Sequence, residues 1–136
     1  MDVIGQNEIL ISYHQFTVYQ HGMKRPHFDW LESALEKGYV ADQYAAAFAA
    51  ETSSKALIEV RVSSSGQEPE CTIQIPFHVK DTGIEVSSVM SEKLTCELSS
   101  GDYMLCMNAI SLGKQEDTGE HKMKYELTFI PSEKPA

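Results

Sequence analysis

The chain has 136 residues and a formal net charge of −9, because 20 Asp and Glu face 11 Lys and Arg. This length suits one domain over 1–136 that buries a core without a metal or a disulfide. The acidic balance argues against a general nucleic-acid binder and against docking on anionic membranes, since both need basic side chains.

The first predicted element is a strand over residues 9–19, ILISYHQFTVY, which is rich in β-branched and aromatic side chains. Its apolar alternation changes phase part-way. Either both faces of this strand are partly covered, or a bulge lies near His14 and Gln15. A loop containing Gly22 and Pro26 follows.

A short helix of two to three turns is predicted next. Asp29 and Glu32 have the spacing of a capping box, and Gly38 suits a left-handed stop. Leu31 and Leu35 are four residues apart, so we expect them to share a buried face.

Residues 44–51, YAAAFAAE, favour a helix by alanine propensity but a strand by context. The alternating run ALIEVRVS follows after ETSSK, so we predict two strands joined as a hairpin around Thr52–Lys55. The small alanines would then mark close packing of another element over that face.

The rest of the chain alternates regularly. Strands are predicted in CTIQIPFHV, in IEVSSV, on both sides of a hairpin turn at 99–102, and in HKMKYELTFI, with a tail over 131–136. Pro76 lacks an N–H, so we expect its strand to be an edge there or to be bulged, and an edge would be either protected or paired in a homodimer. About eight strands with turns every 8–12 residues predict a mainly β, antiparallel β-sandwich with one short α-helix.

The cysteines and the N-terminus predict a cytoplasmic protein. The N-terminal residues show neither a basic leader nor a cleavage pattern, and no stretch of the chain has the length and apolarity of a membrane span. Cys71, Cys96 and Cys106 are odd in number and contain no C-x-x-C spacing, so we expect free, buried thiols in place of a zinc site.

Patterns that carry catalysis are absent from the sequence. His14, His21 and His27 are separated by 7 and 6 positions, with no H-x-H or H-E-x-x-H, and no serine lies in G-x-S-x-G. His78 lies at an outward strand position and could act as a base only beside a carboxylate in a cleft. We therefore predict no enzyme activity, no catalytic residue, no metal site and no cofactor.

The negative charge is regional. Between Val62 and Glu120 ten acids face three bases, which gives −7 of the total −9. A negative field of this kind speeds encounter with a basic partner. The candidate partner-binding residues are Glu68, Glu70, Asp81, Glu85, Glu116, Asp117 and Glu120.

Five stretches together resemble the competence protein J family: ISYHQFTVYQ, FDWLESALEKGY, FAAETSSKALIEVRV, IPFHVKDTGIEVSSVMS and LSSGDYML. The resemblance covers roughly residues 9–112. It implies an inhibitor that binds the membrane-associated nuclease which cuts incoming DNA during transformation, without catalysis of its own. It implies a nuclease as the partner, no direct nucleic-acid contact, no membrane insertion, and action at the membrane through that partner.

Three alternatives stay open at the level of the sequence. The first is an immunity-type protein against another nuclease. The second is a small-ligand or carbohydrate-binding sandwich whose concave face is lined by Trp30, Tyr39, Tyr44 or Tyr103. The third is an enzyme built on His14 or His78 beside a carboxylate in a pocket.

Overall fold

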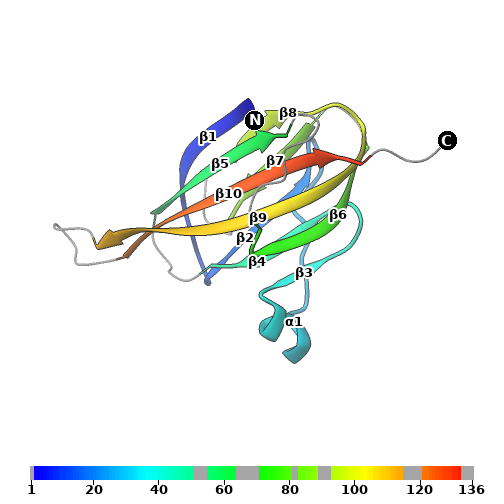
Figure 1. The fold of residues 1–136 in the computed structure, drawn as a ribbon. Coiled ribbons are helices and arrows are strands. Elements are labelled where there is room, and N and C mark those ends of the chain that lie inside the picture. The colour runs from blue at the N-terminus through cyan, green and yellow to red at the C-terminus, as the bar shows by residue number, and fades with distance from the viewer. Residues whose placement is uncertain are drawn as a thin grey trace.

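The computed structural model describes residues 2–50, 55–63, 71–80, 83–88, 93–114 and 121–132. In these parts of the chain ten strands form two five-stranded sheets, and one short helix projects beyond them (Figure 1). The predicted mainly β sandwich with one short helix is confirmed, but the described residues form ten strands where about eight were predicted, and one strand pair is parallel. In chain order the elements are β1 Asp2–Leu10, β2 Gln15–Gln20, α1 Glu32–Lys37, β3 Tyr39–Ala41, β4 Ala46–Ala49, β5 Lys55–Val62, β6 Ile73–Val79, β7 Gly83–Ser87, β8 Leu94–Glu97, β9 Gly101–Lys114 and β10 His121–Pro131.

The first sheet has the order β1-β5-β10-β9-β6, and the second has the order β3-β4-β2-β7-β8. All neighbouring strands are antiparallel except β5 and β10, which run parallel. The β6 strand lies at one edge of the first sheet, so the edge position that Pro76 predicted is confirmed.

The inner faces of the two sheets meet in one apolar core. Phe16 on β2 and Tyr125 on β10 have ring centroids 4.9 Å apart, and Phe16 also lies 5.5 Å from Phe48 on β4. Phe77 and Phe129 form a second, edge-to-face pair at 5.6 Å. These five rings are almost fully buried, and burying each contributes roughly 2–3 kcal/mol to folding.

The continuous strand predicted over residues 9–19 is wrong. β1 ends at Leu10 in the first sheet and β2 begins at Gln15 in the second, so the chain crosses between the sheets here. Tyr13 and His14 form the turn with φ values of 56° and 53°. The change of phase that suggested a bulge is therefore a change of sheet.

Two predicted hairpins are also crossings between sheets. The strand predicted over 44–51 is confirmed as β4, but β4 lies in the second sheet and its expected partner β5 in the first. Likewise β8 and β9 lie in different sheets. At the β8–β9 corner the Tyr103 hydroxyl donates a hydrogen bond of 2.8 Å to the carbonyl oxygen of Ser99. Sequence spacing predicted the turn at residues 99–102 but not which strands it joins, and residues 52–54 of the other predicted turn lie outside the described residues.

Helix α1 is shorter than predicted and differs at its start. Its end agrees: Gly38 has φ 85° and donates its N–H to the carbonyl of Ala34. Its start is at Leu31 with no side-chain cap, so the capping role predicted for Asp29 is wrong. The buried leucine face is wrong as well, since Leu31 and Leu35 are 68% and 63% exposed. A six-residue helix makes fewer than two turns, and only Ala34 faces the protein. Among the described residues, no helix has the length and apolarity needed to cross a bilayer.

The prediction of three free thiols is wrong for two of them. Cys71 and Cys106 form a disulfide with their Cα atoms 5.3 Å apart. The pairing of β6 with β9 brings these residues together although they are 35 positions apart in sequence. Cys96 is free and buried, as predicted, and its burial raises the pKa of the thiol to about 11.

Candidate functional site

Of the seven predicted partner-binding acids, the structure describes one. Glu85 lies on β7 and is 5% exposed. Its Oε1 lies 3.2 Å from Nδ1 of His21, and its Oε2 lies 3.7 Å from Nζ of Lys93. This carboxylate therefore offers little surface to a partner. The other six residues lie outside the described residues: Glu68, Glu70, Asp81, Glu116, Asp117 and Glu120.

The segment that joins β2 to α1 covers part of the outer face of the second sheet, over β2 and β4. This segment is held at its far end by Trp30, whose Nε1 donates a hydrogen bond of 2.7 Å to Oε1 of Gln15. Ala47 on β4 is 1% exposed, which confirms that the small alanines mark close packing of another element. The hollow left beneath the segment measures about 40 Å³ and holds no more than a few waters. Its lining is Gln15, Thr17, Arg25, Pro26, His27, Phe28, Ala47 and Ser88.

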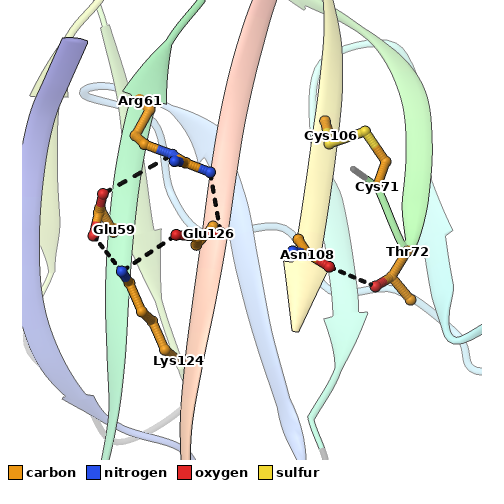
Figure 2. Close-up of polar contacts among 8 residues, drawn as sticks. All are labelled: Glu59, Arg61, Cys71, Thr72, Cys106, Asn108, Lys124 and Glu126. Carbon is orange, nitrogen blue, oxygen red and sulfur yellow. Dashed lines mark hydrogen bonds and ion pairs between the residues drawn. A yellow bond between two sulfur atoms is a disulfide. The ribbon is translucent and has the colours of Figure 1, made fainter. Parts of the chain in front are cut away.

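The outer face of the first sheet carries four charged side chains in a closed ring (Figure 2). Arg61 lies 3.1 Å from Glu126 and 3.9 Å from Glu59, and Lys124 lies 2.8 Å from Glu59 and 3.2 Å from Glu126. All four come from the parallel pair β5 and β10, and each side chain is 11–21% exposed. Two acids and two bases cancel, so this ring presents no net charge.

The titration of neighbouring groups reflects the same pairing. Hydrogen bonding to Glu59 raises the pKa of Lys124 above its ordinary value, and Glu126 adds to the effect. Further along this face, the ammonium of Lys122 is paired with Glu8, and its hydrogen bond lowers the pKa of that carboxyl. The acids of the first sheet's outer face are thus largely neutralised by lysine and arginine.

His78 on β6 has a carboxylate partner, which is one of the two features that a catalytic base requires; the other is a cleft for the substrate. Its Nδ1 lies 2.7 Å from Oδ1 of Asp102, and the ring of Tyr44 packs edge-on against it at 5.7 Å. Lys80 lies 4.2 Å above the centre of the Tyr44 ring. A histidine oriented by a carboxylate resembles a general base. Neither described hollow includes this pair, however, and the His78 side chain is 38% exposed to solvent.

The other described histidines are dispersed. His27 lies 3.8 Å from Asp29 with both side chains almost fully exposed, and His21 pairs with Glu85 on the other sheet. Within the described ranges, no group of three or more His, Cys, Asp and Glu side chains is arranged to hold a metal ion.

The four aromatic residues considered for ligand binding do not converge. Tyr103 is 8% exposed and bonded to Ser99, while Tyr44 packs on His78. An open hollow of about 300 Å³ between α1 and β3 is lined by Tyr39 alone among the four. Trp30 donates its indole N–H to Gln15 of β2, so it ties the segment before α1 to the second sheet.

Sequence reasoning missed the surface of α1. Helix α1 projects from the sandwich (Figure 1). Five side chains of the helix and of the residues just before it, which we call the helix tip, are Asp29, Leu31, Glu32, Leu35 and Glu36. All five are exposed. The length of the apolar pattern could have revealed this surface. A buried helix face needs apolar residues over several turns, and Leu31 and Leu35 are followed by Gly38 one turn further on.

Comparison with known proteins identifies the family. A sequence model described as Competence protein J (ComJ) matches residues 8–130. The chain belongs to the competence protein J family. The predicted resemblance is thereby confirmed, and the match extends through β10, beyond the stretches that carried the resemblance in the sequence.

Two proteins with described roles are similar to this chain, one by sequence and one by structure. The chain is 44% identical over 100 residues to the DNA-entry nuclease inhibitor of Bacillus subtilis strain 168, an alignment covering 72% of this chain and 76% of that protein. The crystal structure of ComJ from Bacillus subtilis, described as an inhibitor of the DNA-degrading activity of NucA, superimposes with a TM-score of 0.80. That superposition has 32% sequence identity and covers 97% of this chain and all of the other.

Proposed function

We propose that this chain inhibits the DNA-degrading activity of a DNA-entry nuclease by binding it, without catalysis or cofactor of its own. The observation that carries this proposal is the 44% identity to a DNA-entry nuclease inhibitor across most of both chains. The shared fold supports it, since the ComJ structure matches over 97% of this chain. The exposed setting of the His78–Asp102 pair supports a binding protein over an enzyme.

The proposed mode of inhibition is occlusion of the cleft that holds DNA. A nuclease must attract phosphates, so its cleft carries basic side chains. A chain with a net charge of −9 is attracted to such a cleft and competes there with DNA. Acids proposed to contribute are Glu68, Glu70, Asp81, Glu116, Asp117 and Glu120, whereas the buried Glu85 is left out.

The proposed place of action is the cytoplasm, at the membrane through the nuclease. The Cys71–Cys106 disulfide argues against the cytoplasm, because such bonds persist mainly in oxidising compartments. Fractionation of cells expressing the untagged chain tests it. Recovery with the cytoplasm and with nuclease-containing membranes supports the proposal, and recovery outside the cell contradicts it.

A titration of nuclease activity tests the function. Purified NucA of Bacillus subtilis, and the related nuclease from the genome that encodes this chain, are each incubated with rising amounts of the protein and a linear DNA. Loss of cleavage that is complete near one inhibitor per nuclease supports stoichiometric binding. Undiminished cleavage by both nucleases at about tenfold excess contradicts the proposal. Inhibition should weaken as salt rises from about 0.05 to about 0.5 M, because salt screens exposed charges.

A further inference from the structure

Helix α1 presents apolar surface that the fold does not use. Leu31 and Leu35 are 68% and 63% exposed, and Ala34 alone among the helix residues is buried. Beside the helix, an open hollow of about 300 Å³ is lined in part by Leu31, Ala34 and Tyr39. Exposed apolar surface at a projecting element is typical of contact with another protein.

The helix is nevertheless firmly attached to the sandwich at both ends. Before it, Trp30 bonds to Gln15 at the start of β2. After it, the N–H of Ala49 on β4 donates a hydrogen bond of 2.8 Å to the carbonyl of Gly38. The backbone that carries the two leucines is therefore held in place before a partner arrives, which reduces the entropy lost on binding.

The leucines lie beside acids that outnumber the bases: Asp29, Glu32 and Glu36 are all exposed, and Lys37 at the end of the helix is the one base among residues 29–37. Glu32 and Glu36 follow Leu31 and Leu35 by one position each, so the carboxylates and the leucines form adjacent stripes on the helix. Both acids are exposed, and neither forms an ion pair within the described part of the chain. Asp29 is exposed as well, and its ion-pair partner among the described residues is the histidine His27 at 3.8 Å.

The two broad faces of the sandwich are less suited to a basic partner. On the first sheet, the ring of Glu59, Arg61, Lys124 and Glu126 is internally neutral (Figure 2). On the second sheet, the segment leading to α1 covers part of β2 and β4. Among the described surfaces, the helix tip combines unpaired carboxylates with exposed leucines.

We propose that the helix tip is the part of this protein that enters the nucleic-acid-binding cleft of the nuclease. This inference rests on the proposed function and adds the surface that performs it. Carboxylates of Glu32 and Glu36 take the place of DNA phosphates against lysine and arginine side chains. Leu31 and Leu35 pack on the apolar stems of those side chains, which remain available when the charged ends are engaged.

The test removes the leucines and the charges separately. Leu31→Gln with Leu35→Gln keeps helix propensity while replacing the apolar surface. The concentration for half-inhibition of NucA should rise about tenfold or more. The matched control is Leu112→Gln on β9, a leucine 47% exposed elsewhere, which should leave inhibition unchanged. Thermal unfolding of each variant confirms that the fold is intact.

The charge variants should act mainly on association. Glu32→Gln with Glu36→Gln should slow binding to NucA severalfold and reduce its dependence on salt. Glu97→Gln on β8 removes an exposed acid away from the tip and serves as the control. Equal losses from the control and the tip variant would indicate an effect of net charge alone and would overturn the proposal.

The outcomes separate the two proposals. If the wild-type chain inhibits and the double leucine variant inhibits equally well, the proposed function stands and the helix tip is not its surface. If the wild-type chain itself fails to inhibit, the function fails. Analytical ultracentrifugation tests whether a second copy of this chain occupies the helix tip instead. A wild-type dimer lost in the double leucine variant, with inhibition unchanged, would assign the tip to a second copy of this chain and overturn the inference.

Discussion

Nε1 of the Trp30 indole donates a hydrogen bond of 2.7 Å to Oε1 of Gln15. This single contact ties the segment that covers part of the second sheet to the first residue of β2. It also fixes the direction in which the chain enters α1. The one tryptophan of the sequence thus positions the helix tip without being part of it.

Replacing Trp30 with Phe should lower the free energy of unfolding by about 1 kcal/mol, since it removes one hydrogen bond but keeps an aromatic ring. Urea denaturation followed by circular dichroism measures this loss. Inhibition of NucA should also weaken, because the helix tip is less firmly held.

A double-mutant cycle with Gln15→Met isolates the bond. If the bond accounts for the loss, the double variant should be little less stable than either single variant. Fully additive losses would show that Trp30 and Gln15 act independently and would remove this contact from the explanation of how α1 is held.

Breaking the ring of charges on the first sheet should lower the stability of the fold without weakening inhibition. Arg61→Met leaves Glu59 and Glu126 close together with one lysine between them. The expected loss is about 2 kcal/mol, between the values for exposed and fully buried pairs. Urea denaturation measures it, and nuclease inhibition by the folded variant should be unchanged.

Two further variants define the cause of that loss. Lys122→Met breaks the more exposed pair with Glu8 and should cost clearly less than Arg61→Met, because water screens an exposed ion pair. Combining Arg61→Met with Glu126→Leu should recover part of the loss, because the unpaired carboxylate is removed as well. A double variant less stable than Arg61→Met would contradict this account of the ring.

The cysteines give a prediction that mass spectrometry checks directly. Alkylation of the unfolded, unreduced chain should label Cys96 alone, and alkylation after reduction should label all three cysteines. The disulfide closes a loop between positions 71 and 106, so reduction should destabilise the fold by about 3–4 kcal/mol. Labelling of all three thiols without a reductant would contradict the pairing.

Stability should decline at alkaline pH. Burial raises the pKa of Cys96 from 9.0 to about 11 and also raises the pKa of Tyr103 above 10.0. Below pH 9 both groups are protonated in the folded and unfolded chains. Above it the unfolded thiol ionises first, so the unfolded state binds fewer protons and the free energy of unfolding falls up to about pH 11.

Denaturation at a series of pH values measures this decline, with Cys96→Ala as the test. The variant should be less sensitive to pH between 9 and 11, and Tyr103→Phe should reduce the sensitivity above pH 10. An unchanged pH profile in Cys96→Ala would show that its burial does not set the alkaline limit.

The sequence predicted the elements better than their partners. Alternation located most strands, the edge at Pro76 and the left-handed stop at Gly38 were correct, and the small alanines of β4 indicated a covering layer. Pairing failed because a turn such as Ser99–Asp102 has the same composition whether it joins neighbours or crosses between sheets. The Cys71–Cys106 bond depends on that pairing, so linear spacing did not reveal it.

The candidate surface was harder to predict for a related reason. Leu31 and Leu35 have the spacing of a buried face, and burial depends on what lies opposite. Ala34 is the one buried residue of the six-residue helix, and both leucines are exposed. Glu85 illustrates the converse, since its acidic side chain was predicted at a binding surface and is 5% exposed.

Hydrogen exchange on the inhibited complex tests most directly whether the helix tip contacts the nuclease. Amides of the chain are compared by mass spectrometry with and without saturating NucA, under conditions where DNA cleavage is fully inhibited. We expect exchange to slow across the segment from Asp29 to Lys37, with little change in β5 and β10. Slowed exchange on the outer face of β5 and β10, with that segment unchanged, would contradict the account.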